Sequence, residues 1–222
     1  MSTSLIDILV RPDAFFSKTA AEKESLRIPA LIILSAGIVA AITGYLMGGL
    51  SAKMMAGVMP GLEAVITLSA MAGAFIGTFI FWLVASGIFY VISSLLKGQG
   101  SFTRVLEVVG YGYLPQIAGS IITLVAAVLY IPGITVPTLS KAALEDPAMI
   151  EQVTKAFMHD PAMMELTQIT TLVSIVFMLW SAHIWIFGIK HARGLSMRNA
   201  AICVGVPIVL YILYLTYNLG VM

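Results

Sequence analysis

Five apolar runs of membrane-crossing length occupy most of the chain. A helix needs about 20 consecutive apolar residues to cross the hydrocarbon core of a bilayer. In lipid the backbone must satisfy its own hydrogen bonds, and a helix does this within a single run. We therefore predict an all-α, polytopic membrane protein with five transmembrane helices. The predicted spans cover residues 29–50, 66–96, 114–131, 168–189 and 200–219.

Composition supports a membrane protein and argues against a nucleic-acid partner. Hydrophobic residues make up 59% of the chain and charged residues 10%, whereas about a quarter of residues are charged in soluble domains. The formal net charge of +1 gives no basic field that would attract nucleic acid. The single cysteine, Cys203, lies in an apolar run and is expected to be a small buried hydrophobe.

Residues 1–28 differ from the rest because charged and apolar residues are mixed in them. A cleavable signal peptide would instead place a short basic region directly before its apolar core. Arg11-Pro12-Asp13 is typical of a helix start. We predict a cytosolic, interfacial helical segment with Phe15 and Phe16 toward the membrane and the charges toward water. A partly ordered cytosolic tail is the alternative.

Residues 134–165, between the third and fourth spans, are polar enough to lie outside the membrane as a helical exterior loop. Two Asp-Pro-Ala-Met repeats, Asp146–Met149 and Asp160–Met163, place an aspartate cap before a proline and predict the starts of two short helices. The acidic residues here, together with His159, are potential metal ligands, but nothing in their spacing shows that they converge. We predict no metal site from Glu145, Asp146, Glu151, Asp160 and Glu165.

Small residues four apart recur in the first two spans, at Gly44 and Gly48 and at Gly73 and Gly77. This spacing permits two helices to approach closely. For both pairs we expect close packing inside the molecule rather than dimerisation.

Basic residues are distributed unevenly between the two sides of the membrane. With the N-terminus inside, nine basic residues are internal and three are external. Loops rich in Lys and Arg remain in the cytosol. We therefore predict a multi-pass cell-membrane protein with a cytosolic N-terminus and an external C-terminus.

The sequence contains no recognisable catalytic motif. It has neither His-Glu-x-x-His nor Gly-x-Ser-x-Gly, and no Asp or Glu lies in a predicted span. Lys97 precedes its glycines, unlike the lysine of a phosphate-binding loop. We expect no enzyme activity, catalytic residue or cofactor. His183 is the one ionisable side chain in a predicted span and a polar functional candidate, although a neutral imidazole bonded to a neighbouring helix is favoured.

The stretch Lys97–Gln116 interrupts the apolar pattern between the second and third spans. Its glycines favour a tight turn, and Ser101 is placed to cap an amphipathic helix over residues 102–111. Proline disfavours helical geometry in the preceding residue, so Leu114 is expected to be a hinge before Pro115. One continuous, kinked helix is the alternative.

Two parts of this stretch, Lys97-Gly98-Gln99-Gly100-Ser101-Phe102 and Tyr111-Gly112-Tyr113-Leu114-Pro115, resemble motifs of the YIP family of Ypt/Rab-GTPase-interacting five-span proteins. Arg11-Pro12 with Phe15-Phe16, and the segment from Gly188 to Ala200, are similar to further parts of its pattern. The resemblance implies a set of motif residues that are candidates for partner binding. They are Arg11, Pro12, Lys97, Gly98, Gly100, Tyr111, Gly112, Tyr113, Pro115, Arg193 and Gly194.

The resemblance implies a role in membrane traffic, contact with prenylated small GTPases and association between family members in Golgi and endoplasmic-reticulum membranes. Residues 1–28 are shorter than the cytosolic region of eukaryotic members, which argues against GTPase binding and for a prokaryotic member in the plasma membrane. We predict a scaffold or adaptor that acts through its cytosolic face on the bilayer, a cytosolic protein or another copy. The alternative is a channel or a transporter of small solutes or lipids, prompted by the Leu114-Pro115 break and His183.

Overall fold

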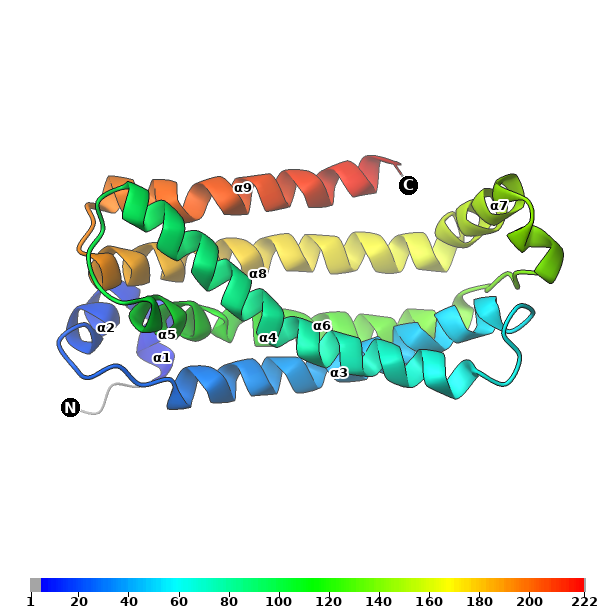
Figure 1. Ribbon diagram of the computed structural model, residues 1–222, viewed down its shortest axis with the longest axis horizontal. Coiled ribbons are helices and arrows are strands. Elements are labelled where there is room, and N and C mark those ends of the chain that lie inside the picture. Colours follow the sequence, from blue (N-terminus) through cyan, green and yellow to red (C-terminus); the bar gives the residue numbers. More distant parts are fainter. Residues whose placement is uncertain (1–4, 222) are drawn as a thin grey trace.

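The computed structural model describes residues 5–221, which form helices, turns and connecting loops with no strand among them. Five helices are long and apolar enough to cross a membrane (Figure 1). The prediction of an all-α, five-span membrane protein is therefore confirmed. Four of them are α3 (Arg27–Met55), α4 (Glu63–Leu95), α8 (Pro161–Arg193) and α9 (Met197–Val221). The remaining one, Phe102–Gly133, is the helical run that contains α6 (Leu114–Tyr130).

The outer surface of the bundle is apolar along the length of these helices. Leu129, Val176 and Leu210 each expose 60% or more of their surface. Exposed apolar area of this extent is unfavourable in water. In a bilayer the same side chains contact lipid, so the outward faces of the helices match the membrane rather than the solvent.

Helices α3 and α4 cross closely at two glycines. A Cβ atom added to Gly44 would lie 2.7 Å from the Cβ of Ala74, and one added to Gly48 would lie 2.7 Å from the Cβ of Ala70. The predicted packing of this pair is confirmed. The prediction for Gly73 and Gly77 is wrong, because a Cβ at either position would meet nothing within 4 Å among the described residues.

The short helices lie at the two ends of the bundle (Figure 1). At one end are α1 (Leu5–Val10), α2 (Pro12–Thr19) and α5 (Phe102–Gly112), together with the turns that follow α4 and α8. At the other end are the 3₁₀ turns η1 (Ile131–Gly133) and η2 (Lys141–Leu144), and α7 (Pro147–Met158).

Both predicted aspartate caps are confirmed, but only the first begins a short helix, because the second begins the 33-residue spanning helix α8. Oδ1 of Asp146 accepts from the Ala148 N–H at 2.9 Å and begins α7, and Oδ1 of Asp160 accepts from Ala162 at 3.0 Å and begins α8. Oδ2 of Asp160 also accepts from the Thr135 N–H at 3.1 Å. Hydrogen bonds from Thr135 and then Met163 lower the pKa of Asp160 below its ordinary value. The cap therefore also ties the exterior loop to α8.

The chain breaks between α5 and α6 at Tyr113, one residue before the predicted hinge. The Tyr113 N–H donates to the Gly110 carbonyl at 3.2 Å, which tightens the last turn of α5. Leu114 is already the first residue of α6, and Pro115 lies in the first turn of that helix, where its missing N–H costs nothing. The two helices meet at this one residue, whose own backbone is helical (φ −75°, ψ −12°), so the segment combines a break in the hydrogen bonding with a continuous helical path.

The main core lies at the end of the bundle that carries α1, α2 and α5. Ile8, Phe15 and Phe16 are buried in it, with Tyr111 of α5 and residues of α8. The expectation that Phe15 and Phe16 face the membrane is wrong, because they pack into the protein. Cys203 is fully buried in the same core, as predicted.

Candidate functional site

Most of the residues singled out from the sequence gather at one end of the bundle. This motif end consists of residues 5–27, 96–113 and 190–198, which come from α1, α2, α5 and the ends of the long helices (Figure 1). The three segments are far apart in sequence, and side chains from each bond to the others.

Arg193 lies at the centre of one such set of bonds, with only 3% of its surface exposed. Its Nε donates to Ser93 Oγ at 2.9 Å, and its Nη2 donates to Ser94 Oγ at 2.8 Å and to the Gly98 carbonyl at 3.0 Å. Nη1 donates to the Gly100 carbonyl. The guanidinium therefore binds the end of α4 and the turn after it from the last residue of α8.

The backbone of this turn fits closely against the end of α8. Lys97 and Gly100 have φ angles of 64° and 105°, which glycine adopts without strain and lysine does not. A Cβ at Gly100 would lie 2.7 Å from the Ala192 carbonyl oxygen. The Gln99 N–H donates to the Arg193 carbonyl at 2.8 Å. The predicted tight turn is confirmed, and its lysine side chain projects to the surface.

Gly194 and Gly98 are two further candidates that contribute through backbone conformation and close packing. Gly194 ends α8 in the left-handed conformation, with φ 61°, a common position for glycine after a helix. Gly98 leaves no room for a side chain, because a Cβ there would lie 2.8 Å from the Ser93 carbonyl oxygen. These glycines shape the motif end rather than offering side chains to a partner.

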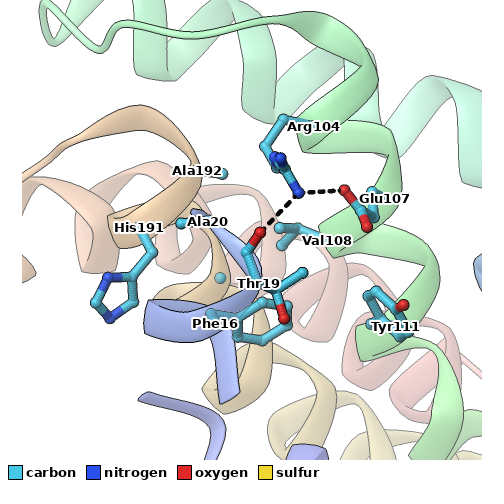
Figure 2. Close-up of a pocket in the computed structure, with 10 residues that line it drawn as sticks. Phe16, Thr19, Ala20, Arg104, Glu107, Val108, Tyr111, His191 and Ala192 are labelled. Carbon is cyan, nitrogen blue, oxygen red and sulfur yellow. Dashed lines mark hydrogen bonds and ion pairs between the residues drawn. The ribbon is translucent and has the colours of Figure 1, made fainter. Parts of the chain in front are cut away.

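A second set of bonds ties the N-terminal segment to α5. Nη1 of Arg104 donates to Glu107 Oε2 at 2.7 Å and to the Thr19 carbonyl at 3.1 Å, and Nη2 donates to the Glu22 carbonyl at 2.5 Å. Figure 2 shows Arg104 between Glu107 and Thr19. Glu107 is 2% exposed and also accepts from the Ser25 backbone N–H. Arg104 and Glu107 thus provide hydrogen-bond partners for the backbone of the segment that leaves α2.

Sequence reasoning missed Arg104 and Glu107. The available signal was two opposite charges three residues apart in a segment that is otherwise apolar, a spacing that pairs side chains on one helix face. The cavity beside them, between Phe16, Tyr111 and His191, measures about 10 Å³ (Figure 2). That is about the space needed by one water molecule, so this cluster holds the fold and has no room for a larger ligand.

Helix α5 is held from two sides by tryptophan side chains. Nε1 of Trp82 donates to the Leu106 carbonyl at 2.8 Å, and Nε1 of Trp185 donates to the Val109 carbonyl at 3.0 Å. Gly112 faces the Trp185 indole so closely that any Cβ there would overlap the ring. The glycine of the Tyr-Gly-Tyr motif therefore permits a helix-to-indole contact.

The aromatic and proline candidates also contact the protein. The Tyr111 ring lies edge-on to Phe15, with 5.2 Å between centroids, and Tyr113 is half-buried against Phe81 at 6.0 Å. Pro12 and Pro115 are buried. All four occupy packing positions.

Charged side chains at the motif end divide into tethered and exposed groups. Asp13 accepts from Lys190 at 2.8 Å and lies 2.7 Å from Nε2 of His191. These hydrogen bonds, the one from Lys190 first, lower the pKa of Asp13 below its ordinary value.

The exposed basic side chains are those of Arg11, Lys18, Lys23, Arg27, Lys97 and Arg198. Of the motif candidates, Arg11 and Lys97 therefore present charge at the surface.

His183 lies in the spanning helix α8, as predicted, but does not make the predicted contact. Its side chain is exposed on the outer side of α8, and its ring lies edge-on to Phe187 with 5.1 Å between centroids. Within residues 5–221 the structure gives it no hydrogen bond, so the predicted bond to a neighbouring helix is wrong. The same described residues contain no cluster of three His, Cys, Asp or Glu side chains that could hold a metal ion.

Replacing Arg104 with lysine is expected to loosen the N-terminal segment. An ammonium group keeps an ion-pair partner for Glu107 but lacks the planar fork that bonds the Thr19 and Glu22 carbonyls together. We expect the free energy of local unfolding of residues 12–25 to fall by about 1–2 kcal/mol. This corresponds to about 10-fold faster amide hydrogen exchange in the same residues. Exchange measured by mass spectrometry checks this. Arg27→Lys, at an exposed position, is the control, and equal exchange in the two variants would contradict the role of Arg104.

Comparisons with known proteins agree with the motifs. The family model described as the Yip1 domain matches residues 6–218 of the chain. An uncharacterised protein of Methanocaldococcus jannaschii is 36% identical over 121 residues, which cover 54% of this chain and 86% of that protein. No solved structure matches the chain.

Proposed function

The chain belongs to the Yip1 domain family, and from this premise we propose that it is a non-enzymatic membrane scaffold that binds partners through its motif end. The protein is a multi-pass membrane protein with five long apolar helices. We place the motif end in the cytosol of a prokaryotic cell because nine basic residues flank that side and three the other. The partner is a cytosolic protein or another copy of the chain.

The observation that carries this proposal is the way the motif end is built. Arg193 and Arg104 bond to backbone carbonyls of separate segments, so three segments form one rigid surface. A preorganised surface loses less conformational entropy on binding than loose loops do. Exposed cations such as Arg11 and Lys97 then steer and orient an acidic partner.

The transporter alternative receives less support from the same geometry. The break before Pro115 packs against Trp185 through Gly112, and His183 faces outward. Neither of the two features that prompted the alternative lines a path through the bundle.

The proposal predicts that exposed cations, and not buried motif residues, control partner binding. We expect the double variant Arg11→Ala/Lys97→Ala to fold normally and to bind at least one specific partner about 10-fold more weakly, because arginine is often a binding hot spot and complementary charges speed and orient association. Quantitative affinity purification from native membranes after crosslinking measures this. Lys53→Ala/Lys141→Ala, at the opposite end of the bundle, is the matched control. A set of partners unchanged from the wild type would contradict the proposal.

A further inference from the structure

A second region of interest lies away from the motif end, between α3, α6 and α8. The cavity there has a volume of about 240 Å³, far above the ~10–15 Å³ that one water molecule needs. It is lined by hydroxyl side chains from all three helices, in segments that cross the membrane. They are Thr43, Thr123, Thr167, Thr170 and Ser174.

The hydrogen-bonding state of these hydroxyl groups sets the chemistry of the cavity. All four threonines donate to a carbonyl of their own helix, and the Oγ1 distances lie between 2.8 and 3.2 Å. A hydroxyl group has one donor and two acceptor lone pairs. With the donor used, each threonine offers the cavity an acceptor. The wall is therefore complementary to a group that donates hydrogen bonds.

The charge of the ligand follows from the rest of the lining. The other side chains around the cavity are apolar, namely Met47, Ala127, Met163 and Leu166. A cation would have no carboxylate partner there, and an uncompensated charge in the membrane is costly. Hydroxyl oxygens with free acceptor lone pairs also favour a hydrogen-bond donor, such as water, over an empty space. The fitting ligand is thus neutral, polar and rich in donors.

We propose that this cavity is a hydrated binding site for a neutral hydroxyl-bearing group. Its source is either a free polyol of three or four carbons or the sugar headgroup of a neutral glycolipid. The shared chemistry is a hydroxyl that donates to threonine oxygens on facing helices. The site is independent of the scaffold function, because it uses no residue of the motif end.

Hydration can be tested with single cysteines on α8 in a Cys203→Ala background. Ser174→Cys would face the cavity, whereas Leu172→Cys and Val176→Cys are matched controls whose native side chains are each 60% exposed on the outer surface. Thiols react as thiolates, which form in water and not in lipid. In proteoliposomes we expect a membrane-impermeant charged maleimide to modify position 174 about 10-fold faster than positions 172 and 176. Equally slow labelling at all three positions would overturn the proposal.

Ligand binding is tested by protection of the same thiol. If the ligand is a free polyol, glycerol or erythritol should slow labelling at position 174 several-fold, relative to labelling of the control Met59→Cys, whose native side chain is exposed. If the ligand is a lipid headgroup, vesicles that contain galactosyl diacylglycerol should slow labelling at position 174 relative to vesicles of phosphatidylcholine alone. Adding Thr170→Val, which keeps the shape and removes one acceptor, should weaken the protection. Absence of protection in both arms would show a cavity that holds water only and would overturn the assigned ligand.

Discussion

Replacing Arg193 with alanine is expected to lower the free energy of unfolding by about 3 kcal/mol or more. A hydrogen bond to a charged group contributes about 1.5–3 kcal/mol, and a buried acceptor left unpaired adds a cost of its own. The Arg193 side chain donates to two serine hydroxyls and two carbonyls. It also lies over the Tyr90 ring, with Cζ 4.4 Å from the centroid, a contact that strengthens when water is excluded.

Lysine should not restore this stability. The ammonium group has donors but no fixed fork, so it cannot reach the Gly98 and Gly100 carbonyls and both serines in the observed geometry. We therefore expect Arg193→Lys to lie closer to Arg193→Ala than to the wild type. Loss of the side chain would also free the turn after α4 from the end of α8, since these two segments meet through it.

Thermal unfolding of the purified protein in detergent, followed by tryptophan fluorescence, measures the effect. A loss of about 3 kcal/mol lowers Tm by roughly 6–12 °C in a chain of this size. Arg198→Ala is the matched control, since Arg198 is an exposed arginine at the same end, and should change stability by about 0.5 kcal/mol at most. Equal Tm values for the two alanine variants would show that Arg193 does not hold the turn.

The five-span architecture was predictable because it rests on local properties of the chain. An apolar run of sufficient length leaves few alternatives in lipid. The caps at Asp146 and Asp160 were predictable for the same reason, since an aspartate before a proline bonds its own helix. Neither inference required knowledge of which segments meet in space.

The contacts of the motif end were not predictable in this way. Phe15 and Phe16 could bury their rings in lipid or in protein, and both environments satisfy an apolar side chain. Gly44 and Gly73 have the same four-residue spacing to a second glycine, but only the first pair meets a neighbouring helix. The spacing of small residues describes the surface of one helix, and it does not show whether another helix packs against that surface.

The same limit applies to the roles of the motif residues. The pattern marked Arg193 as a candidate for partner binding, and its bonds within the chain became visible only when the turn after α4 was placed beside it. Lys97, its neighbour in the motif set, is exposed. Residues of one motif thus divide between fold and surface, and tests of function must use the exposed members.

Gly112→Ala is the second change expected to have a large effect, and it should lower the free energy of unfolding by about 3 kcal/mol. A Cβ at this position would overlap the Trp185 indole, which is 1% exposed and cannot move outward. Overpacking of a core costs about 1–3 kcal/mol. Displacement of the ring would also break its hydrogen bond to the Val109 carbonyl, leaving a buried acceptor unpaired.

The control for Gly112→Ala comes from the second transmembrane helix. Gly73→Ala adds the same methyl group where nothing lies within 4 Å, so it should change stability by about 1 kcal/mol at most, in the stabilising direction. A double-mutant cycle then locates the cause. Trp185→Phe provides room for the methyl group, so the Gly112→Ala/Trp185→Phe variant should lose less stability than the two single losses added together. If the two losses of stability are strictly additive, the effect of Gly112→Ala does not arise from contact with the Trp185 indole, and the role assigned to the glycine of the Tyr-Gly-Tyr motif is wrong.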